Sequence, residues 1–275
     1  MDYDKIVQEI IEEHKASPVD MLGIGDGEGE YNYLNHLKES YIRTVRDVDN
    51  LYKNEKNSRS ILEIGSFLGP VSIALKRIGY KVSVSEIPEF SSKLKPLYEK
   101  NGISFHSLNL KHSKLPFESN SFDVVIMCEV LEHLNFNPLP ILKEMNRVIK
   151  NDGYIYIGMP NQANLHNRIK LLLGKSIHNP LDDYYRQLDK NENMIVGLHW
   201  REYTLPETMQ LIEKMGFETF AKYYFMGQEP PSRNPIKRLI KKIAYSHPPC
   251  RPFQVVIGKK VTSPDYDFWS TEANS

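Results

Sequence analysis

The feature that most constrains the fold of this 275-residue chain is a strand pattern, a glycine turn and a helix pattern over residues 61–75. The run Ile61–Ile64 is short, apolar and β-branched, and an apolar pattern with helical spacing begins at about Gly69. Glycine lets the backbone approach a ligand closely, and the first turn of a helix has N–H groups without a partner inside the helix. This unit predicts a nucleotide-binding loop at the carboxyl end of a strand.

Strand and helix patterns alternate along the chain at intervals of roughly 20–30 residues. The alternation predicts an α/β fold with a Rossmann-like, doubly wound, mostly parallel sheet of seven strands. The strands are expected at 61–64, 81–85, 103–106, 122–127, 154–159, 217–226 and 253–259, and helices at 4–15, 31–53, 70–78, 91–100, 138–150, 165–173 and 204–215.

Polar residues follow the predicted strands at the edge of the sheet that carries the glycine turn. Glu86 ends the second strand, 21 residues after Gly65, at the place where an acidic side chain reaches ribose hydroxyls. Asn109 and Leu110 follow the third strand, where a polar residue can meet an adenine edge beside an apolar wall. The fourth strand leads directly into Glu129 and a predicted helix.

In this order, these blocks resemble class I S-adenosylmethionine-dependent methyltransferases of the small-molecule type. The family typically shows E-x-G, an acidic residue after the second strand, and then LPF, SFDVV, EVLEHL, a glutamate before RVLK, a glycine, and PN. The resemblance extends over about residues 60–260. The matching residues are Glu63, Gly65, Glu86, Leu115–Phe117, Ser121–Val125, Glu129–Leu134, Glu144, Arg147–Lys150, Gly153 and Pro160–Asn161.

The resemblance implies that S-adenosylmethionine is the cofactor. Glu63 and Gly65 would hold its methionine end, Glu86 its ribose diol and Asn109 its adenine. Cys128 and Glu129 would line the floor where donor and acceptor meet. The full set of expected cofactor-binding residues is Glu63, Gly65, Ser66, Phe67, Gly69, Glu86, Ile87, Asn109, Leu110, Cys128 and Glu129.

Two residues depart from the family pattern. Asn109 replaces the more usual aspartate, but its amide oxygen can still accept a hydrogen bond from the adenine amino group. Phe67 replaces the second glycine of the loop, and a Cβ at that position hinders close backbone approach. The ligand has no pyrophosphate, which weakens the need for a bare glycine. An impaired pocket in a non-catalytic relative remains the alternative.

A possible metal site lies in the E-x-x-E-H run. Glu129, Glu132 and His133 have helical i, i+3, i+4 spacing and would share one helix face. Two carboxylates and an imidazole suit a divalent ion such as Mg²⁺, Mn²⁺ or Zn²⁺, with His199 as the fourth ligand. Similar runs bind metal in quinone-type O-methyltransferases and small-RNA 2′-O-methyltransferases. In the alternative interpretation Glu129 borders the cofactor, and Glu132 and His133 form hydrogen bonds to neighbouring loops.

A histidine is also the candidate catalytic base. His199, or else His133, would take a hydroxyl proton during in-line attack on the sulfonium methyl. Positioning alone is the alternative, because the methyl donor is already activated. His199 would then be a packed or capping histidine ahead of the helix that begins at Thr204.

Three further segments lie outside the cofactor pattern. The glycine-rich run 23–29 resembles a phosphate loop, but no strand precedes it, so it is either an entry to the next helix or part of a lid. Segment 235–243 is a basic amphipathic helix that packs on the sheet, contacts an anionic membrane or a lipid-linked glycan, or binds nucleic acid, the least favoured of these alternatives. Residues expected to form a cap over a polyhydroxylated or phosphorylated acceptor are Asn161, Asn164, His166, Asn167, Arg168, Tyr184 and Tyr185.

The segments combine into an expected domain plan. Residues 1–55 form an N-terminal helical cap, 56–261 the methyltransferase domain and 262–275 a tail. The domain contains an acceptor-capping insertion at 160–203 and a basic insertion at 228–251.

Composition narrows partners and compartment. Lys+Arg and Asp+Glu number 35 each, so no global charge favours nucleic acid. Only two cysteines are present, which fits a reducing compartment, and no apolar run approaches the ~20 residues of a spanning helix. The N-terminus is an acidic amphipathic helix unlike a signal peptide, so a cytoplasmic location is expected.

The predicted function is transfer of a methyl group to an oxygen of a small polar acceptor, such as a sugar or an intermediate of surface polysaccharide biosynthesis. Two alternatives stay open: a quinone-type or RNA 2′-O-methyltransferase with a divalent metal, and a non-catalytic protein that binds S-adenosylmethionine. An NAD-dependent oxidoreductase is disfavoured, because one glycine of its fingerprint is absent.

Overall fold

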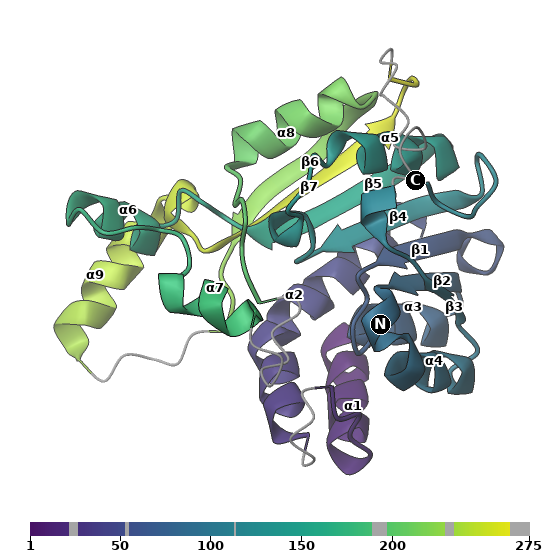
Figure 1. Ribbon diagram of the computed structural model, residues 1–275, viewed down its shortest axis with the longest axis horizontal. Helices are drawn as coiled ribbons and strands as arrows, with labels where there is room; N and C mark the ends of the chain where they lie inside the picture. The colour runs from purple at the N-terminus through teal and green to yellow at the C-terminus, as the bar shows by residue number, and fades with distance from the viewer. Residues whose placement is uncertain (22–26, 53–54, 113, 189–196, 229–233, 265–275) are drawn as a thin grey trace.

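A seven-stranded sheet forms the centre of the molecule (Figure 1). The computed structural model describes residues 1–21, 27–52, 55–112, 114–188, 197–228 and 234–264, without the side chains of 236, 237 and 240. The strand order is β3-β2-β1-β4-β5-β7-β6, and β7 is antiparallel to both of its neighbours, whereas the other pairs are parallel. The strands are β1 (Ser60–Ile64), β2 (Lys81–Glu86), β3 (Ser104–Ser107), β4 (Phe122–Cys128), β5 (Ile149–Pro160), β6 (Phe217–Phe225) and β7 (Phe253–Lys260).

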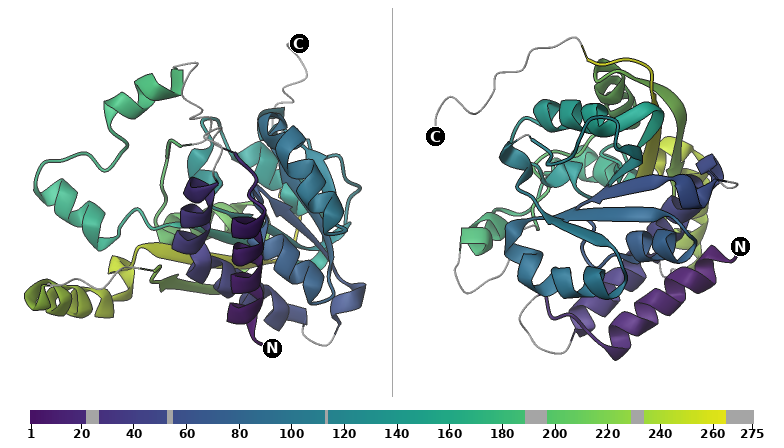
Figure 2. Two further views of the ribbon diagram at one scale, coloured as in Figure 1. Left: turned by 90° about the horizontal axis from the view of Figure 1, so that it is seen from below. Right: turned by 90° about the vertical axis from the view of Figure 1, so that its right-hand side faces the viewer.

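Helices cover both faces of the sheet, as Figure 2 shows from two further sides. Successive strand residues point to opposite faces, so Ile61 and Val124 pack with the first four helices, and Leu62 and Val125 with α5 and α8. In β4 every buried residue except Asp123 is apolar, as expected for a parallel strand covered on both sides. The main helices are α1 (Tyr3–Ala16), α2 (Glu28–Tyr52), α3 (Pro70–Arg77), α4 (Ser91–Lys100), α5 (Leu139–Val148), α6 (Leu165–Leu172), α7 (Leu181–Leu188), α8 (Leu205–Lys214) and α9 (Pro235–Ser246).

The predicted α/β fold is confirmed, and most predicted elements lie within a few residues of the observed ones. The start of β5 differs from the prediction. The sequence predicts this strand at 154–159, but β5 already begins at Ile149, with a register shift against β4 between Phe122 and Val124. The predicted lid residues 23–26 lie outside the described part of the chain.

The sheet gathers the candidate site at one edge. Because β1 to β5 are parallel, their carboxyl ends meet at the same edge, together with the loops that follow them. Gly65, Glu86, Asn109 and Glu129, which follow β1 to β4 or end one of them, are thereby brought to this edge.

Helices α6, α7 and α9 extend from one side of the sheet (Figures 1 and 2). None of the described residues of α7 and α9 is buried, and in α6 only Asn167 is. Within the described ranges, no helix is both long enough and apolar enough to cross a membrane.

Candidate active site

In the glycine loop between β1 and α3, every second residue from Gly65 to Gly69 has a left-handed backbone. The φ angles are 70° at Gly65, 46° at Phe67 and 74° at Gly69. A Cβ on Gly65 would collide with the side chain of Val130, so glycine is required there. The Tyr98 hydroxyl of α4 donates to the Phe67 carbonyl at 2.6 Å and lies 2.8 Å from the Ser66 hydroxyl. Tyr98 therefore holds Ser66 and Phe67 of the loop in place. No sequence motif indicates this role.

The Phe67 side chain packs between helix α2 and the turn that follows β2. Its ring makes edge contacts with Tyr33 of α2 and with Phe90 of the short turn Pro88–Phe90, at centroid distances of 5.5 and 6.2 Å. A left-handed residue in this place has the backbone conformation that glycine usually supplies. The aromatic ring thus links the loop to α2, while the backbone of Phe67 keeps the left-handed conformation typical of glycine.

Glu86 closes the loop from the end of β2. One carboxylate oxygen accepts from the Phe67 amide and the other from the Ile87 amide, and the side chain is buried. Burial raises the pKa of Glu86 to about 7, although these two hydrogen bonds act in the opposite direction. A carboxylate has about four lone-pair positions, so both oxygens can still accept hydrogen bonds from ribose hydroxyls.

Glu63 and Asn109 are both engaged within the chain. Glu63 is buried and accepts from the Ser72 hydroxyl of α3, and burial raises the pKa of its carboxyl to about 8. Asn109 is exposed, and its amide oxygen accepts from the Lys111 amide at 3.0 Å in the turn Leu110–His112.

The N-terminal helices close over the loop. His14 of α1 is buried, and its Nε2 donates to the Leu68 carbonyl at 2.7 Å. Tyr33 of α2 is 44% exposed, yet burial and the carboxylates of Glu129, Glu132 and Glu86 all raise the pKa of its hydroxyl. Tyr33 therefore lies over the same sheet edge as these three acids. Neither His14 nor Tyr33 was predicted, because only the fold brings α1 and α2 to this edge.

The expected helix through the E-x-x-E-H run is wrong. Glu129 has a left-handed φ of 54°, and only Leu131–His133 form a single turn of 3₁₀ helix. A left-handed residue breaks the α-helical path, so Glu129 does not share a helix face with Glu132 and His133. Cys128 nevertheless ends β4 and Glu129 follows it, at the sheet edge that carries the glycine loop, and burial raises both their pKa values.

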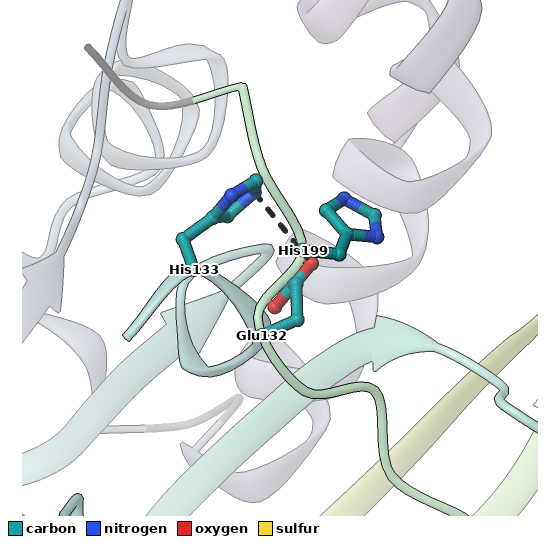
Figure 3. A group of neighbouring side chains, drawn as sticks. All are labelled: Glu132, His133 and His199. Atoms are coloured by element: carbon teal, nitrogen blue, oxygen red, sulfur yellow. Dashed lines mark ion pairs between the residues drawn. The ribbon is translucent and has the colours of Figure 1, made fainter. Parts of the chain in front are cut away.

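Glu132, His133 and His199 form a compact group (Figure 3). One ligand atom from each lies within 4.8 Å of the others, and Glu129 is not a member. Glu132 is fully buried, and neither of its carboxylate oxygens has a hydrogen-bond partner among the residues that the structure describes. Glu132 Oε1 is 4.0 Å from His133 Nε2, the pair marked by the dashed line in Figure 3.

Both histidines are oriented through Nδ1. His133 Nδ1 donates to the Leu198 carbonyl, and His199 Nδ1 donates to Glu202 Oε1, each at 2.9 Å. This arrangement leaves Nε2 of each ring as the atom that can bind a cation or accept a proton. A buried carboxylate without a partner beside two such imidazoles fits a divalent metal, since metal-binding histidines usually donate their other N–H to a carbonyl or carboxylate.

The titration of the group follows from burial and close charges. Burial raises the pKa of Glu132 to about 7 and lowers that of His133 to about 4, where His199 adds to the effect. Burial alone would lower the pKa of His199, but the hydrogen bond to Glu202 and the charge of Glu132 raise it above its ordinary value. The group thus attracts positive charge, either a proton on His199 or a cation.

A pocket opens beside His199 on the cap side. The Asn179 amide oxygen accepts from the His199 backbone N–H at 3.0 Å, and Trp200 makes an edge contact with Tyr184 of α7. Glu202 and Asn179 were not predicted as site residues, although Glu202 lies three residues after His199. The pocket is lined by Gln162, Ile177, His178, Asn179, His199 and Glu202.

The amides predicted to form the acceptor cap make hydrogen bonds within the insertion and to the segment before β7. Asn161 donates to the carbonyls of Pro249 and Arg251, Asn164 caps α6, and Asn167 donates to Gln162 and Glu202. Irregular backbone leaves many polar groups unpaired, and short amide side chains satisfy them.

The strand order with an antiparallel β7, the glycine loop and the acid after β2 are those of class I S-adenosylmethionine-dependent methyltransferases. One similar structure is a SAM-dependent methyltransferase, possible histamine N-methyltransferase, from Thermotoga maritima (20% identity, 92% of this chain and 99% of that chain, TM-score 0.53). A second is magnesium protoporphyrin IX methyltransferase from Synechocystis with bound SAH (13% identity, 83% and 87%, TM-score 0.54). A third comes from a complex of the Haloferax volcanii Trm112 methyltransferase activator with a methyltransferase (12% identity, 88% and 94%, TM-score 0.56).

Residues 62–157, from β1 to β5, match the methyltransferase domain family. Residues 62–157 thus form a methyltransferase domain, and the fold around them is similar to that of S-adenosylmethionine-dependent methyltransferases. An uncharacterized protein of Methanocaldococcus jannaschii is 37% identical over 73 residues, which cover 26% of this chain and 31% of that protein. The chain therefore spans about a third of the length of this curated relative.

Proposed function

We propose that the chain transfers a methyl group from S-adenosylmethionine to an oxygen of a small polar acceptor, such as a sugar or an intermediate of a surface glycan. The observation that carries the proposal is the polar pocket beside His199, which adjoins the sheet edge of the glycine loop. Amides, imidazoles and a carboxylate line this pocket, and such groups suit an acceptor with several hydroxyls.

The cofactor side of the proposal follows from the geometry of the loop. Glu86 would accept from the ribose hydroxyls, Asn109 and Leu110 would border the adenine, and Glu63 and Gly65 would border the methionine end. Cys128 and Glu129 would form the floor toward the acceptor. The wall of the cofactor pocket would be formed by the remaining residues of the predicted set, which are Ser66, Phe67, Gly69 and Ile87.

The cofactor supplies a methyl group on a positively charged sulfur, so the protein must mainly position the acceptor oxygen and remove its proton. His199 suits the second task. Its Nδ1 proton is held by Glu202, so the lone pair lies on Nε2 and can accept the hydroxyl proton. Glu202 stabilises the resulting imidazolium through the same hydrogen bond.

A divalent cation is the second candidate for this step. The observation that favours it is the buried Glu132 carboxylate, which has no hydrogen-bond partner among the described residues and lies beside His133 and His199. These three residues would hold Mg²⁺ or Mn²⁺, whereas Glu129, the other predicted ligand, lies outside the group. When bound, the cation would lower the pKa of an acceptor hydroxyl. This version favours a quinone-type or RNA 2′-O-methyltransferase.

Radiolabelled methyl transfer into lysate fractions, with polysaccharide included, tests the activity. A labelled polar or glycan fraction is expected. Binding of S-adenosylmethionine without transfer to any fraction would contradict the proposal and favour a non-catalytic binding protein.

Substitution of His199 tests its role as a base. His199→Ala is expected to lower turnover about 100-fold or more, because general-base catalysis typically contributes that much. Cofactor affinity measured by calorimetry should change little. The matched control is His247→Ala, an exposed histidine outside the predicted acceptor cap, which should retain activity. An unchanged rate for His199→Ala would refute the assignment.

Chelation distinguishes the two candidates. If a cation acts, excess EDTA abolishes turnover and added Mg²⁺ or Mn²⁺ restores it, and Glu132→Gln is as inactive as His199→Ala. Full activity in excess EDTA eliminates the cation and leaves the histidine as the base.

A further inference from the structure

Two segments of the chain have a strongly one-sided charge. Residues 161–181 and 234–258 contain no Asp or Glu, whereas the whole chain has equal numbers of acidic and basic residues. Together they include α6 and α9. Their basic residues are Arg168, Lys170, Lys175, Lys237, Arg238, Lys241, Lys242 and Arg251.

The same segments expose large apolar side chains. Leu171, Leu172 and Leu173 end α6, and Leu172 is 85% exposed. On α9, Leu239 and Ile243 lie four residues apart and therefore on one helix face, and Ile243 is 64% exposed. A Cβ on Gly174, directly after the leucines, would have no atom within 4 Å, so this end of α6 stands in open space.

The fold places the points where the two segments join the sheet side by side. The last residue of β5, Pro160, pairs with the first residue of β7, Phe253, so the chain leaves the sheet and returns to it at neighbouring points. Asn161, directly after β5, binds the segment that leads into β7: its backbone N–H donates to the Pro252 carbonyl, and its side chain donates to the carbonyls of Pro249 and Arg251. Helices α6 and α9 extend from this point on the same side of the molecule (Figures 1 and 2).

Single exposed leucines are normal on soluble proteins, but several on two segments with a common root indicate an interaction surface. The charge of the segments decides between occupants. A second copy docked through the same surface would place like charges against each other, which disfavours association. The phosphates of nucleic acid could bind the basic residues, but bases stack on aromatic rings, and the exposed apolar side chains here are aliphatic. An anionic lipid surface complements both the basic and the apolar groups.

We propose that the surface of α6, residues 173–175 and α9, here called the arm surface, docks on an anionic lipid bilayer. Leu171–Leu173, Leu239 and Ile243 enter the boundary between headgroups and acyl chains, and the exposed basic side chains of Lys175, Arg238 and Lys242 lie at the lipid phosphates. The helices lie on the membrane rather than across it. This inference is independent of the proposed reaction, because it uses none of the residues at the cofactor edge or beside His199.

Co-sedimentation of the full chain with lipid vesicles tests the proposal. The protein should pellet with phosphatidylcholine vesicles that contain phosphatidylglycerol and not with phosphatidylcholine alone, and raised salt should release it, because exposed charges are screened. Leu172→Glu, and separately the pair Arg238→Glu and Lys242→Glu, should each lower the partition coefficient about tenfold or more, since each basic residue contributes about 1 kcal/mol.

Matched controls lie outside the arm surface. Val261→Glu and Lys222→Glu change exposed residues of the same types, and both should bind vesicles like the unaltered protein. Equal binding to both vesicle types, or undiminished binding by the arm variants, would overturn the proposal. A dimer in vesicle-free solution that dissociates in Leu172→Glu would also overturn it, by assigning the leucines to a contact between copies.

Discussion

Two residues at the cofactor edge, Phe67 and Glu129, have left-handed backbone without being glycine. Such conformations cost about 1–3 kcal/mol each and persist only where surrounding contacts hold them. The Tyr98 hydroxyl holds the carbonyl of Phe67, and Glu86 holds its amide. The missing glycine in the sequence therefore reflects a loop that reaches the same conformation through tertiary contacts.

Replacement of Phe67 by glycine should have a small net effect. Glycine relieves the strain of about 1–3 kcal/mol, while the loss of two aromatic contacts costs about 0.5–1.5 kcal/mol each. We expect the free energy of unfolding to change by about 1 kcal/mol or less, and cofactor affinity by calorimetry to remain largely intact. A large gain in affinity would show instead that Phe67 obstructs the pocket.

Cofactor affinity should depend on pH through Glu86. The carboxyl of Glu86 has a pKa of about 7, so in the free protein it is protonated below that pH and ionised above it. Only the ionised form offers both oxygens to ribose hydroxyls. The Kd for S-adenosylmethionine should therefore rise several-fold as pH falls from 8 to 6, by up to about tenfold per unit below pH 7.

The Glu86→Gln variant provides the control. It should bind the cofactor more weakly, and its Kd should vary less with pH than that of the unaltered protein. The same pH dependence in both proteins would assign the effect to another group.

At the scale of elements, α1 is coupled to the cofactor loop. His14→Ala removes the hydrogen bond to the Leu68 carbonyl and leaves that acceptor without its partner, which costs about 1–3 kcal/mol. We expect a lower free energy of unfolding and about fivefold weaker cofactor binding, measured by urea unfolding and calorimetry. Glu9→Ala, at an exposed position of the same helix, is the control. Lower stability with unchanged affinity would restrict α1 to a structural role.

Elements were predicted better than the contacts between them. The alternation of apolar strands with capped helices indicates most of the sheet, and Thr204 and Glu207 form the capping box that their spacing predicts. The E-x-x-E-H run has helical spacing but forms only one 3₁₀ turn, because the backbone of Glu129 is left-handed. His14 and Tyr33 lie far in sequence from the glycine loop, and only tertiary packing brings them to it. Glu202 contacts His199 from three residues along the chain.

For the whole molecule, the edge of the sheet opposite the site carries a charged network. Asp123 is buried and accepts from Arg59, Lys150 and the Ser60 amide at 2.7–2.8 Å. Burial alone would raise the pKa of Asp123, but these hydrogen bonds lower it below its ordinary value. The network joins the beginnings of β1, β4 and β5.

Asp123→Asn should destabilise the protein by about 2–3 kcal/mol, at the low end for a broken buried pair because Arg59 and Lys150 are partly exposed. Since the folded pKa is lowered, the contribution of Asp123 is present above its ordinary pKa and is lost as pH falls through the folded value. Urea unfolding should show a difference at pH 7 that shrinks in strong acid. Cofactor affinity should stay unchanged, and a marked loss would contradict the separation of the two edges.

The position of Trp200 makes tryptophan fluorescence a probe of the site. Its backbone N–H donates to the Glu132 carbonyl at 2.8 Å, and its ring contacts Tyr184 of the cap. The chain has only one other tryptophan, Trp269, so a Trp269→Phe protein would carry a single fluorophore beside the buried carboxylate. The emission of that fluorophore would report directly on events at Glu132 and on the placement of α7, in unlabelled protein and in real time.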